Sequence, residues 1–140
     1  MKTLKTGDEI ILCISTRDQG HGLLRELAQL GCRVVLLTLN ELRDAGWPHD
    51  ALDDFQTMPG GLTEQQLANT VTYLARTRRF SRILALGAAD MSIAAMLREH
   101  MRIPGMGRTT TQLFCDRLAM RARADQLGIR VPAYCAILNY

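Results

Sequence analysis

The residue types best suited to hold a small charged ligand gather in two stretches, residues 15–22 and 87–92. The first reads Ser-Thr-Arg-Asp-Gln-Gly-His-Gly and would present backbone N–H groups at the start of a helix, which suits an anion. Arg17 could meet a substrate carboxylate there or face solvent. Gly20 and Gly22 lack the third glycine of a dinucleotide-binding fingerprint, so they could equally ease a tight turn from a strand into a helix.

Asp90 is the acidic residue of the second stretch and has two interpretations. It directly precedes an apolar pattern of helical spacing, where an aspartate commonly caps the helix. It could instead contact a ligand, because both stretches are expected to follow strands of one sheet. We favour the cap and keep the ligand role as the alternative.

Other chemistries find little support in the residue types. His21, His49 and His100 are too far apart in the sequence to form a metal-ligand pair, and the four cysteines include no CxxC pair. Cys13 and Cys135 are expected in buried strands, where a thiol packs as a small apolar group. No serine, histidine and acid arrangement indicates a hydrolase. The residues alone therefore predict neither a metal site nor a catalytic group.

The composition is that of an ordinary globular domain with an unusual choice of cations. Of 140 residues 47% are apolar and 22% charged, and only two of the 17 basic residues are lysines. Between residues 98 and 130 seven arginines stand against three acids, which suits a phosphate-bearing ligand, an acidic partner or solvated helix faces. Aromatic residues, at 5%, are too few for a nucleic-acid stacking surface. No apolar run could span a membrane and the N-terminus does not read as a secretory signal, so we expect a cytoplasmic protein.

The hydrophobic pattern predicts strands that alternate with helices. Continuous apolar runs indicate strands at residues 9–15, 33–39 and 82–86, with a short fourth strand near 103–107 and a further one at 133–138. Residues 40–61 read as irregular. We therefore predict a Rossmann-like three-layer α/β domain, in which a parallel sheet of about four strands carries helices on both faces.

The helices have distinct patterns. The first is expected to bury a stripe of leucines, Leu23, Leu27 and Leu30. The second starts at a capping box formed by Thr63 and Gln66, and the third follows Asp90. A long helix is expected over residues 109–127, with apolar side chains buried along one face, Phe114, Leu118 and Ala122.

Residues 83–134 hold a series of short motifs in a distinctive order. An acid follows a strand, then come a helix of Ala-Ala-x-Leu-Arg character, an Ile-Pro-Gly turn, an Asp-Arg pair and a closing Gly-Ile-x-x-Pro. The matching residues are Asp90, Ala94, Ala95, Arg98, Pro104, Gly105, Asp116, Arg117 and Gly128 to Pro132. This series resembles the front domain of the ATP-grasp superfamily, which includes biotin carboxylase, the carbamoyl phosphate synthetase large subunit and D-alanine–D-alanine ligase. Together with the first strand, its glycine-bearing loop and the second strand, the resemblance covers nearly the whole chain.

The resemblance implies a fold, a domain division and a reaction. It implies a pre-ATP-grasp domain at residues 1–108, followed at 109–140 by a linking helix and the first strand of an ATP-grasp domain that is absent here. Enzymes of this superfamily phosphorylate a carboxylate with Mg-ATP, and an amine or other nucleophile then attacks the acyl phosphate. ATP and Mg²⁺ would therefore be the cofactors of a longer parent ligase.

The resemblance also implies roles for individual residues. Arg117 takes the position of a basic residue that contacts nucleotide phosphate, where lysine is common and arginine also occurs. Arg17, Gly20, Gly22 and Asp90 would border the substrate side of the cleft.

One departure from the superfamily bears on mechanism. Its remaining nucleotide-binding lysines and its magnesium-binding carboxylates lie in the domain that follows, and this chain has no lysine after Lys5. Phosphoryl transfer needs a metal clamp and cationic charge on the phosphates. We therefore expect the 140 residues alone to be inactive and to bind no cofactor tightly. The unpaired last strand predicts a homodimer or exchange of the tail with a neighbour.

Two other hypotheses remain open. A free-standing Rossmann-like module could bind a small anionic ligand or a protein partner through residues 15–22. A receiver-type interaction domain fits less well, because Asp8 and Glu9 precede the first strand instead of following it. Under the ligase hypothesis the partners are the rest of the same polypeptide and a small-molecule carboxylate, with neither nucleic acid nor membrane.

Overall fold

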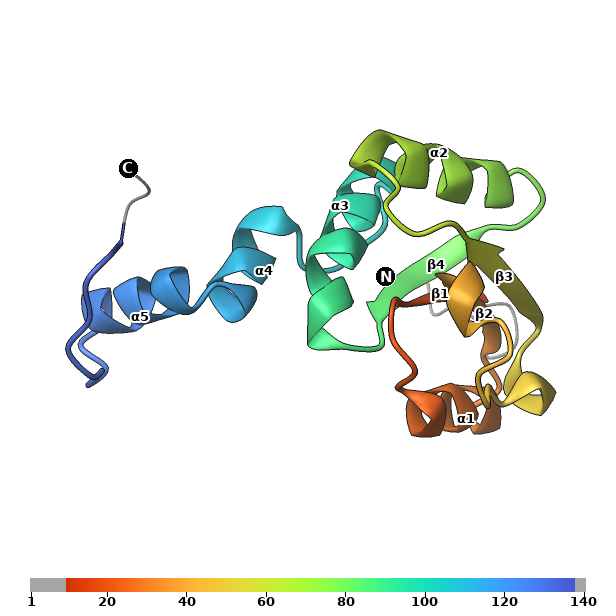
Figure 1. The fold of residues 1–140 in the computed structure, drawn as a ribbon, viewed down its shortest axis with the longest axis horizontal. Coiled ribbons are helices and arrows are strands. Elements are labelled where there is room, and N and C mark those ends of the chain that lie inside the picture. Colours follow the sequence, from red (N-terminus) through yellow and green to blue (C-terminus); the bar gives the residue numbers. More distant parts are fainter. Residues whose placement is uncertain (1–9, 138–140) are drawn as a thin grey trace, which may run out of the picture.

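The computed structural model describes residues 10–137, which form a four-stranded parallel sheet in the order β3-β2-β1-β4 (Figure 1). The strands are β1 (Ile10–Ser15), β2 (Arg33–Leu39), β3 (Asp54–Met58) and β4 (Phe80–Ala85). The α-helices are α1 (His21–Gln29), α2 (Glu64–Leu74), α3 (Met91–Met101), α4 (Arg108–Cys115) and α5 (Arg117–Gln126). Single 3-10 turns are η1 (Asn40–Leu42), η2 (His49–Ala51) and η3 (Ala88–Asp90). Among these residues no helix is long and apolar enough to cross a membrane.

β1 lies in the middle of the sheet and is buried along its whole length. Its side chains divide between two cores, because successive residues of a strand point to opposite faces. Ile10, Leu12 and Ile14 pack with side chains of α2 and α3, whereas Ile11 and Cys13 pack with the α1 side. Figure 1 accordingly shows α1 on one side of the sheet and α2 and α3 on the other. The predicted three-layer parallel α/β fold is confirmed.

Several predicted elements are confirmed in detail. β2 covers the predicted residues 33–39, and Thr63 caps α2 through the expected capping box. The Gln66 N–H donates to Thr63 Oγ1 at 3.2 Å, and the Thr63 N–H donates to Gln66 Oε1 at 2.9 Å. Glu9, the predicted first residue of β1, lies outside the described residues.

The buried stripe of α1 differs from the expected one. Leu24 is fully buried and Leu27 packs beside it, whereas Leu23 and Leu30 are 42% and 66% exposed. The helix begins at His21, and Leu24 and Leu27, three residues apart, share the face that meets the sheet. Leu23 and Leu30 therefore fall outside that face.

The predicted fourth strand near residues 103–107 is wrong, because no strand forms there. The remaining strand of the sheet is β3, which lies within residues 40–61, the segment predicted to be irregular. β3 is an edge strand, and four of its five residues are only half-buried, so its sequence lacks a continuous apolar run. Asp54 at its start forms an ion pair with Arg78 from the loop before β4. Burial alone would raise the pKa of Asp54, but hydrogen bonds from Arg78, Gln56 and the Phe55 N–H lower that pKa below its usual range.

The long helix expected over residues 109–127 is two helices, because Asp116 interrupts it. The backbone of Asp116 is extended, and its carboxylate accepts from Leu118 N at 2.8 Å and from Ala119 N at 3.2 Å as the N-cap of α5. No residue of α5 is buried: Leu118 is exposed and Ala122 half-buried, and Phe114 of α4 is exposed as well. Figure 1 shows α5 projecting away from the sheet.

The two cysteines expected in buried strands differ. Cys13 is buried in β1, and burial raises the pKa of its thiol to about 12, as expected for a packing residue. Cys135 is exposed, because the described part of the expected strand, residues 133–137, forms no strand. Ile137 in the same stretch is 87% exposed. Residue 138 lies outside the described residues.

Two leucines of α1 provide a matched test of the core. We expect Leu24→Ala to lower the free energy of unfolding by about 2–5 kcal/mol, because it leaves a cavity between α1 and the sheet. Leu30→Ala, on the exposed end of the same helix, should change it by less than about 0.5 kcal/mol. Urea unfolding of both variants measures the difference, and similar losses would contradict the observed orientation of α1.

The Asp54–Arg78 pair predicts a pH dependence of stability. The pKa of Asp54 is lower in the folded chain than in the unfolded one. Its stabilising contribution is therefore present above the unfolded value of about 3.9 and is lost as the pH falls through the lower folded value. Asp54→Asn and Arg78→Gln should each reduce the loss of stability below about pH 4. Urea unfolding between neutral and acidic pH tests this, and an undiminished acid loss in both variants would refute it.

Candidate ligand-binding site

β1 is also the point at which the strand order turns. From β1 the chain moves outward through β2 to β3, then returns to place β4 on the other side of β1. In open parallel sheets, ligands bind outside the carboxyl ends of the strands at such a switch point. Residues 15–20, at the end of β1, and residues 86–90, after β4, form this part of the molecule, here named the switch-point edge. Leu86 N donates to Ile14 O at 2.9 Å and joins the two segments.

Buried polar side chains concentrate at the switch-point edge. Of the four buried polar or charged residues among residues 10–137, Ser15 and Asp90 belong to this edge, and Thr38 of β2 stands opposite Ser15. Thr38 Oγ1 donates to Ser15 O at 2.8 Å, and Ser15 Oγ donates to Arg17 O at 2.6 Å. Buried polar groups cost free energy unless they are hydrogen-bonded. The hydroxyls of Ser15 and Thr38 are both hydrogen-bonded, and the carbonyls that accept these bonds are held in place just at and after the end of β1.

Asp90 connects the two segments of the edge. Its side chain is fully buried, and Oδ1 accepts from Thr16 N at 3.0 Å and from Thr16 Oγ1 at 2.5 Å. Asp90 precedes α3, but its side chain makes no capping hydrogen bond, so the favoured interpretation as a helix cap is wrong. Its second oxygen, Oδ2, has no hydrogen-bond partner among the described residues.

Close packing of the two segments requires glycine. Gly20 has a φ of 85°, and a Cβ there would lie 2.7 Å from Leu86 Cβ. A Cβ at Gly87 would overlap the side-chain amide of Gln19, but this flexible end can move aside, so the requirement is strict only at Gly20. Gly22 differs, because it lies in the first turn of α1 and a Cβ there would meet nothing within 4 Å. Of the two glycines in the predicted loop, only Gly20 is needed for close packing, and Gly22 is not.

The residues predicted to bind ligands lie in two places. Arg17, Gly20 and Asp90 belong to the switch-point edge, with Gly22 just beyond it in α1, and the Arg17 side chain is exposed. Arg117 is exposed at the start of α5, and the preceding Cys115 contacts Met91 at the start of α3, with Cys115 Sγ 3.8 Å from Met91 Sδ. The expected substrate residues therefore lie together, whereas the Arg117 side chain forms no hydrogen bond or ion pair with any of them among the described residues.

Ser15, Thr16 and Thr38 belong to the site although no motif marks them. Ser15 and Thr38 stand opposite each other in the register of β1 and β2. A hydroxyl residue near the end of each apolar run is a usable signal, because parallel strands end at the same edge of a sheet. Thr16 has no comparable signal, since its partner lies 74 residues later in the sequence.

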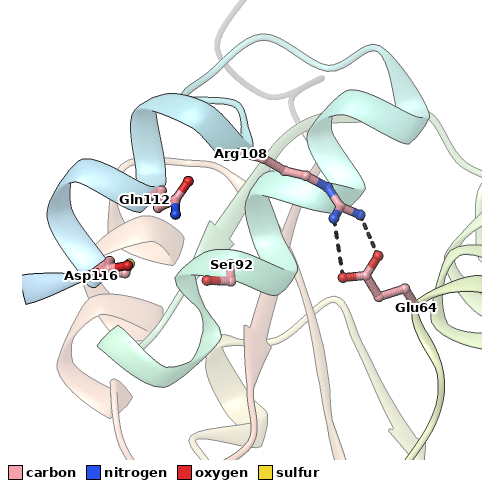
Figure 2. A pocket seen from close by; sticks show the side chains of 6 residues that line it. Glu64, Ser92, Arg108, Gln112 and Asp116 are labelled. Atoms are coloured by element: carbon pink, nitrogen blue, oxygen red, sulfur yellow. Dashed lines mark hydrogen bonds and ion pairs between the residues drawn. The ribbon is translucent and has the colours of Figure 1, made fainter. Parts of the chain in front are cut away.

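An open hollow of about 470 Å³ lies elsewhere, among α2, α3 and α4. Its lining residues are Glu64, Ser92, Arg108, Gln112, Cys115 and Asp116. Figure 2 shows Arg108 extending from the start of α4 to Glu64, with hydrogen bonds of 2.6 and 3.3 Å. Glu99 forms a second ion pair with this arginine. Because its one lining cation is already neutralised, the hollow is a poor site for a phosphate.

Residues 10–137 contain no group of three or more His, Cys, Asp or Glu side chains that could hold a metal ion. Arg117, the expected phosphate contact, is not among the residues that line the hollow.

Solved structures with a similar fold include a ligase and two biotin carboxylase domains. An L-amino acid ligase from Bacillus licheniformis matches 94% of this chain with a TM-score of 0.75 and 17% identity. The biotin carboxylase domain of a thermophilic 2-oxoglutarate carboxylase, bound to bicarbonate, matches 86% with a TM-score of 0.59 and 17% identity. The biotin carboxylase domain dimer of the Hydrogenobacter thermophilus 2-oxoglutarate carboxylase, in complex with MgADP, ADP and bicarbonate, matches 86% with a TM-score of 0.60 and 17% identity.

The matches cover only part of those enzymes. This chain spans 35% of the ligase chain and 28% and 27% of the two carboxylase chains, about a third of their length or less. No family model and no curated protein sequence matches the chain. The chain therefore has the fold of one portion of these enzymes, in agreement with the resemblance read from its sequence.

The two glycines of the predicted loop provide a matched pair of variants. Gly20→Ala should lower the free energy of unfolding by about 1–3 kcal/mol, because it combines a left-handed backbone with a clash against Leu86. Gly22→Ala should leave stability unchanged or raise it by up to about 1 kcal/mol, because alanine favours a helix and the space is open. Thermal and urea unfolding measure both. Equal effects would contradict the packing of the loop on Leu86.

Proposed function

We propose that this chain is the pre-ATP-grasp domain of an ATP-dependent carboxylate–amine ligase or a related ligase, and forms one wall of the cleft for substrate and nucleotide. The observation that carries the proposal is the structural match, in which 94% of this chain aligns with an L-amino acid ligase while spanning 35% of it. In this proposal residues 1–108 form the domain, and residues 109–140 lead into an ATP-grasp domain.

The switch-point edge is the proposed substrate side of the cleft. Arg17 supplies an exposed guanidinium, whose planar fork suits a carboxylate. Gly22 lies in the first turn of α1, where backbone N–H groups favour negative charge. Gly20 and Asp90 complete the edge through the contacts with Leu86 and Thr16. A small-molecule carboxylate is therefore the proposed ligand.

The exposed apolar side chains around α5 support a following domain. These side chains are Leu118, Met120, Leu127 and Ile129. Exposed apolar groups that gather on one element commonly mark an interaction surface. In the parent ligase this helix would pack against the ATP-grasp domain and bring Arg117 to the nucleotide phosphates. Mg-ATP would supply the phosphoryl group of an acyl phosphate there.

The proposal extends to the assembly and location of the parent. One of the matched carboxylase structures is a domain dimer, which supports a homodimeric parent. We place the parent in the cytoplasm, with no role on nucleic acids or membranes.

A free-standing module that binds a small anion or a partner is the second candidate. It is favoured by one observation: the side-chain hydrogen bonds of the switch-point edge all form between residues 15 and 90. Such a module would bind its ligand with full affinity as the 140-residue chain, whereas a ligase domain would bind it more weakly without the rest of the cleft.

The first test is an assay of the purified chain. We expect no release of phosphate from Mg-ATP above a blank, with or without L-amino acids or bicarbonate, because the resemblance assigns the nucleotide-binding lysines and magnesium-binding carboxylates to a following domain, and this chain has no lysine after Lys5. Colorimetric phosphate detection is sufficient. Turnover by the 140 residues would contradict the non-catalytic role.

The second test concerns Arg117 in the native polypeptide purified from its source cells. Arg117→Ala should raise KM for ATP by about tenfold or more, because a charge-assisted phosphate contact contributes about 1.5–3 kcal/mol. Arg123→Ala is the matched control on the same helix, since this side chain contacts only Gln126, at 3.4 Å, among the described residues. Equal KM values in the wild type and Arg117→Ala would refute the nucleotide contact.

A further inference from the structure

Asp90 occupies a helix N-cap position without acting as a cap. α3 begins at Met91, and no backbone N–H of its first turn donates to the Asp90 side chain. A capping aspartate stabilises a helix by about 1 kcal/mol, which α3 forgoes. The carboxylate instead accepts hydrogen bonds from Thr16, which follows β1, the strand paired with β4.

This use of the carboxylate carries a second cost. Asp90 is the one fully buried acid among residues 10–137. Two donors, the N–H and the hydroxyl of Thr16, share Oδ1, and Oδ2 has no partner in the described part of the chain. Burying an incompletely satisfied carboxylate is unfavourable. A carboxylate buried at this cost needs a physical explanation, and its place at the edge where ligands bind in such folds suggests a role in the binding site.

The role of Asp90 follows from the position of Thr16 between Ser15 and Arg17. Ser15 and Arg17 flank it, and both of their carbonyls are already held, by Thr38 Oγ1 and by Ser15 Oγ. Those two bonds come from β2 and from β1 itself, so they fix the loop from one side. Asp90 supplies the side-chain hydrogen bonds from the β4 side. Without them, the backbone N–H of Thr16, the residue before Arg17, loses its partner.

We propose that Asp90 is a positioning residue: it anchors Thr16, and thereby sets Arg17 and the start of α1 for a small carboxylate ligand. Because Asp90 is fully buried, it acts through Thr16 and does not touch the ligand. The inference rests on the proposed function, since it takes this edge to be the carboxylate side of the cleft.

The anchoring is tested by amide hydrogen exchange of Thr16, followed by NMR on the purified chain. We expect Asp90→Ala to accelerate exchange of the Thr16 amide by about tenfold or more, because its acceptor is removed. Asp90→Asn keeps a carbonyl oxygen as acceptor and should remain within about threefold of the wild type. The amide of Gln66, capped by Thr63 in α2, should not change and reports the global fold. Equal Thr16 exchange in Asp90→Ala and the wild type would overturn the proposal.

The positioning role is tested by binding of sodium acetate, followed through the Arg17 and Gly22 amide resonances at constant ionic strength. Thr16→Val should weaken acetate binding by about fivefold or more, because it deletes the hydroxyl bonded to Asp90. Thr16→Ser, which retains that hydroxyl, should remain within about twofold. Thr16 is half-buried, so both variants are expected to fold even where Asp90→Ala does not.

The outcomes separate the two claims. Equal acetate affinity in Thr16→Val and the wild type would overturn the positioning role. Absence of saturable acetate binding by the wild type would overturn the carboxylate role of this edge, and the exchange of the Thr16 amide would still decide whether Asp90 anchors the loop. Sodium chloride at the same concentration separates specific carboxylate binding from an effect of salt.

Discussion

β1 pairs with β2 on one side and with β4 on the other, and helices cover both of its faces. A strand buried in this way can meet a ligand only at its ends. Because all four strands are parallel, the carboxyl ends of β1, β2 and β4 come to one edge of the sheet. The apolar run that builds the centre of the core therefore also determines where the first polar residues after it must lie. Ser15 and Thr16 are those residues, and the candidate site begins with them.

The elements that follow from sequence are those whose burial is complete. β1 and β2 are covered on both faces, so their sequences are continuous apolar runs that only a central strand explains. β3 is an edge strand that carries Asp54 and Gln56, and its half-buried pattern is indistinguishable from a loop without knowledge of its neighbour. The division between α4 and α5 could not be predicted from the sequence either, because an aspartate at position 116 is equally compatible with the surface of one long helix.

The candidate site was predictable in position but not in its internal contacts. The rule that ligands bind beyond the carboxyl ends of parallel strands identifies Arg17, Gly20 and Asp90 from the element order alone. The hydrogen bonds of Asp90 depend on the order in which β1 and β4 pair, and local sequence favours the cap that the structure does not contain. Arg117 rests on the motif resemblance, and its role stays a prediction because no contact among the described residues tests it.

The packed sheet and helix α5 differ in how well their apolar side chains are covered. The sheet and its three packed helices are a closed core, whereas α5 contributes no buried side chain and carries exposed apolar groups. Exposed apolar side chains on a helix outside the packed core commonly mark an interaction surface, which supports the proposal of a following domain. The chain's span of about a third of the matched ligase agrees with this description.

The intact mass of the native polypeptide, measured by mass spectrometry on protein isolated from its source cells, tests most directly whether this fold is one domain of a longer ligase. We expect a mass well above the 15.6 kDa of these 140 residues, with peptides that continue beyond Tyr140. A native mass of 15.6 kDa would contradict the ligase proposal and leave a free-standing module that binds its ligand at the switch-point edge.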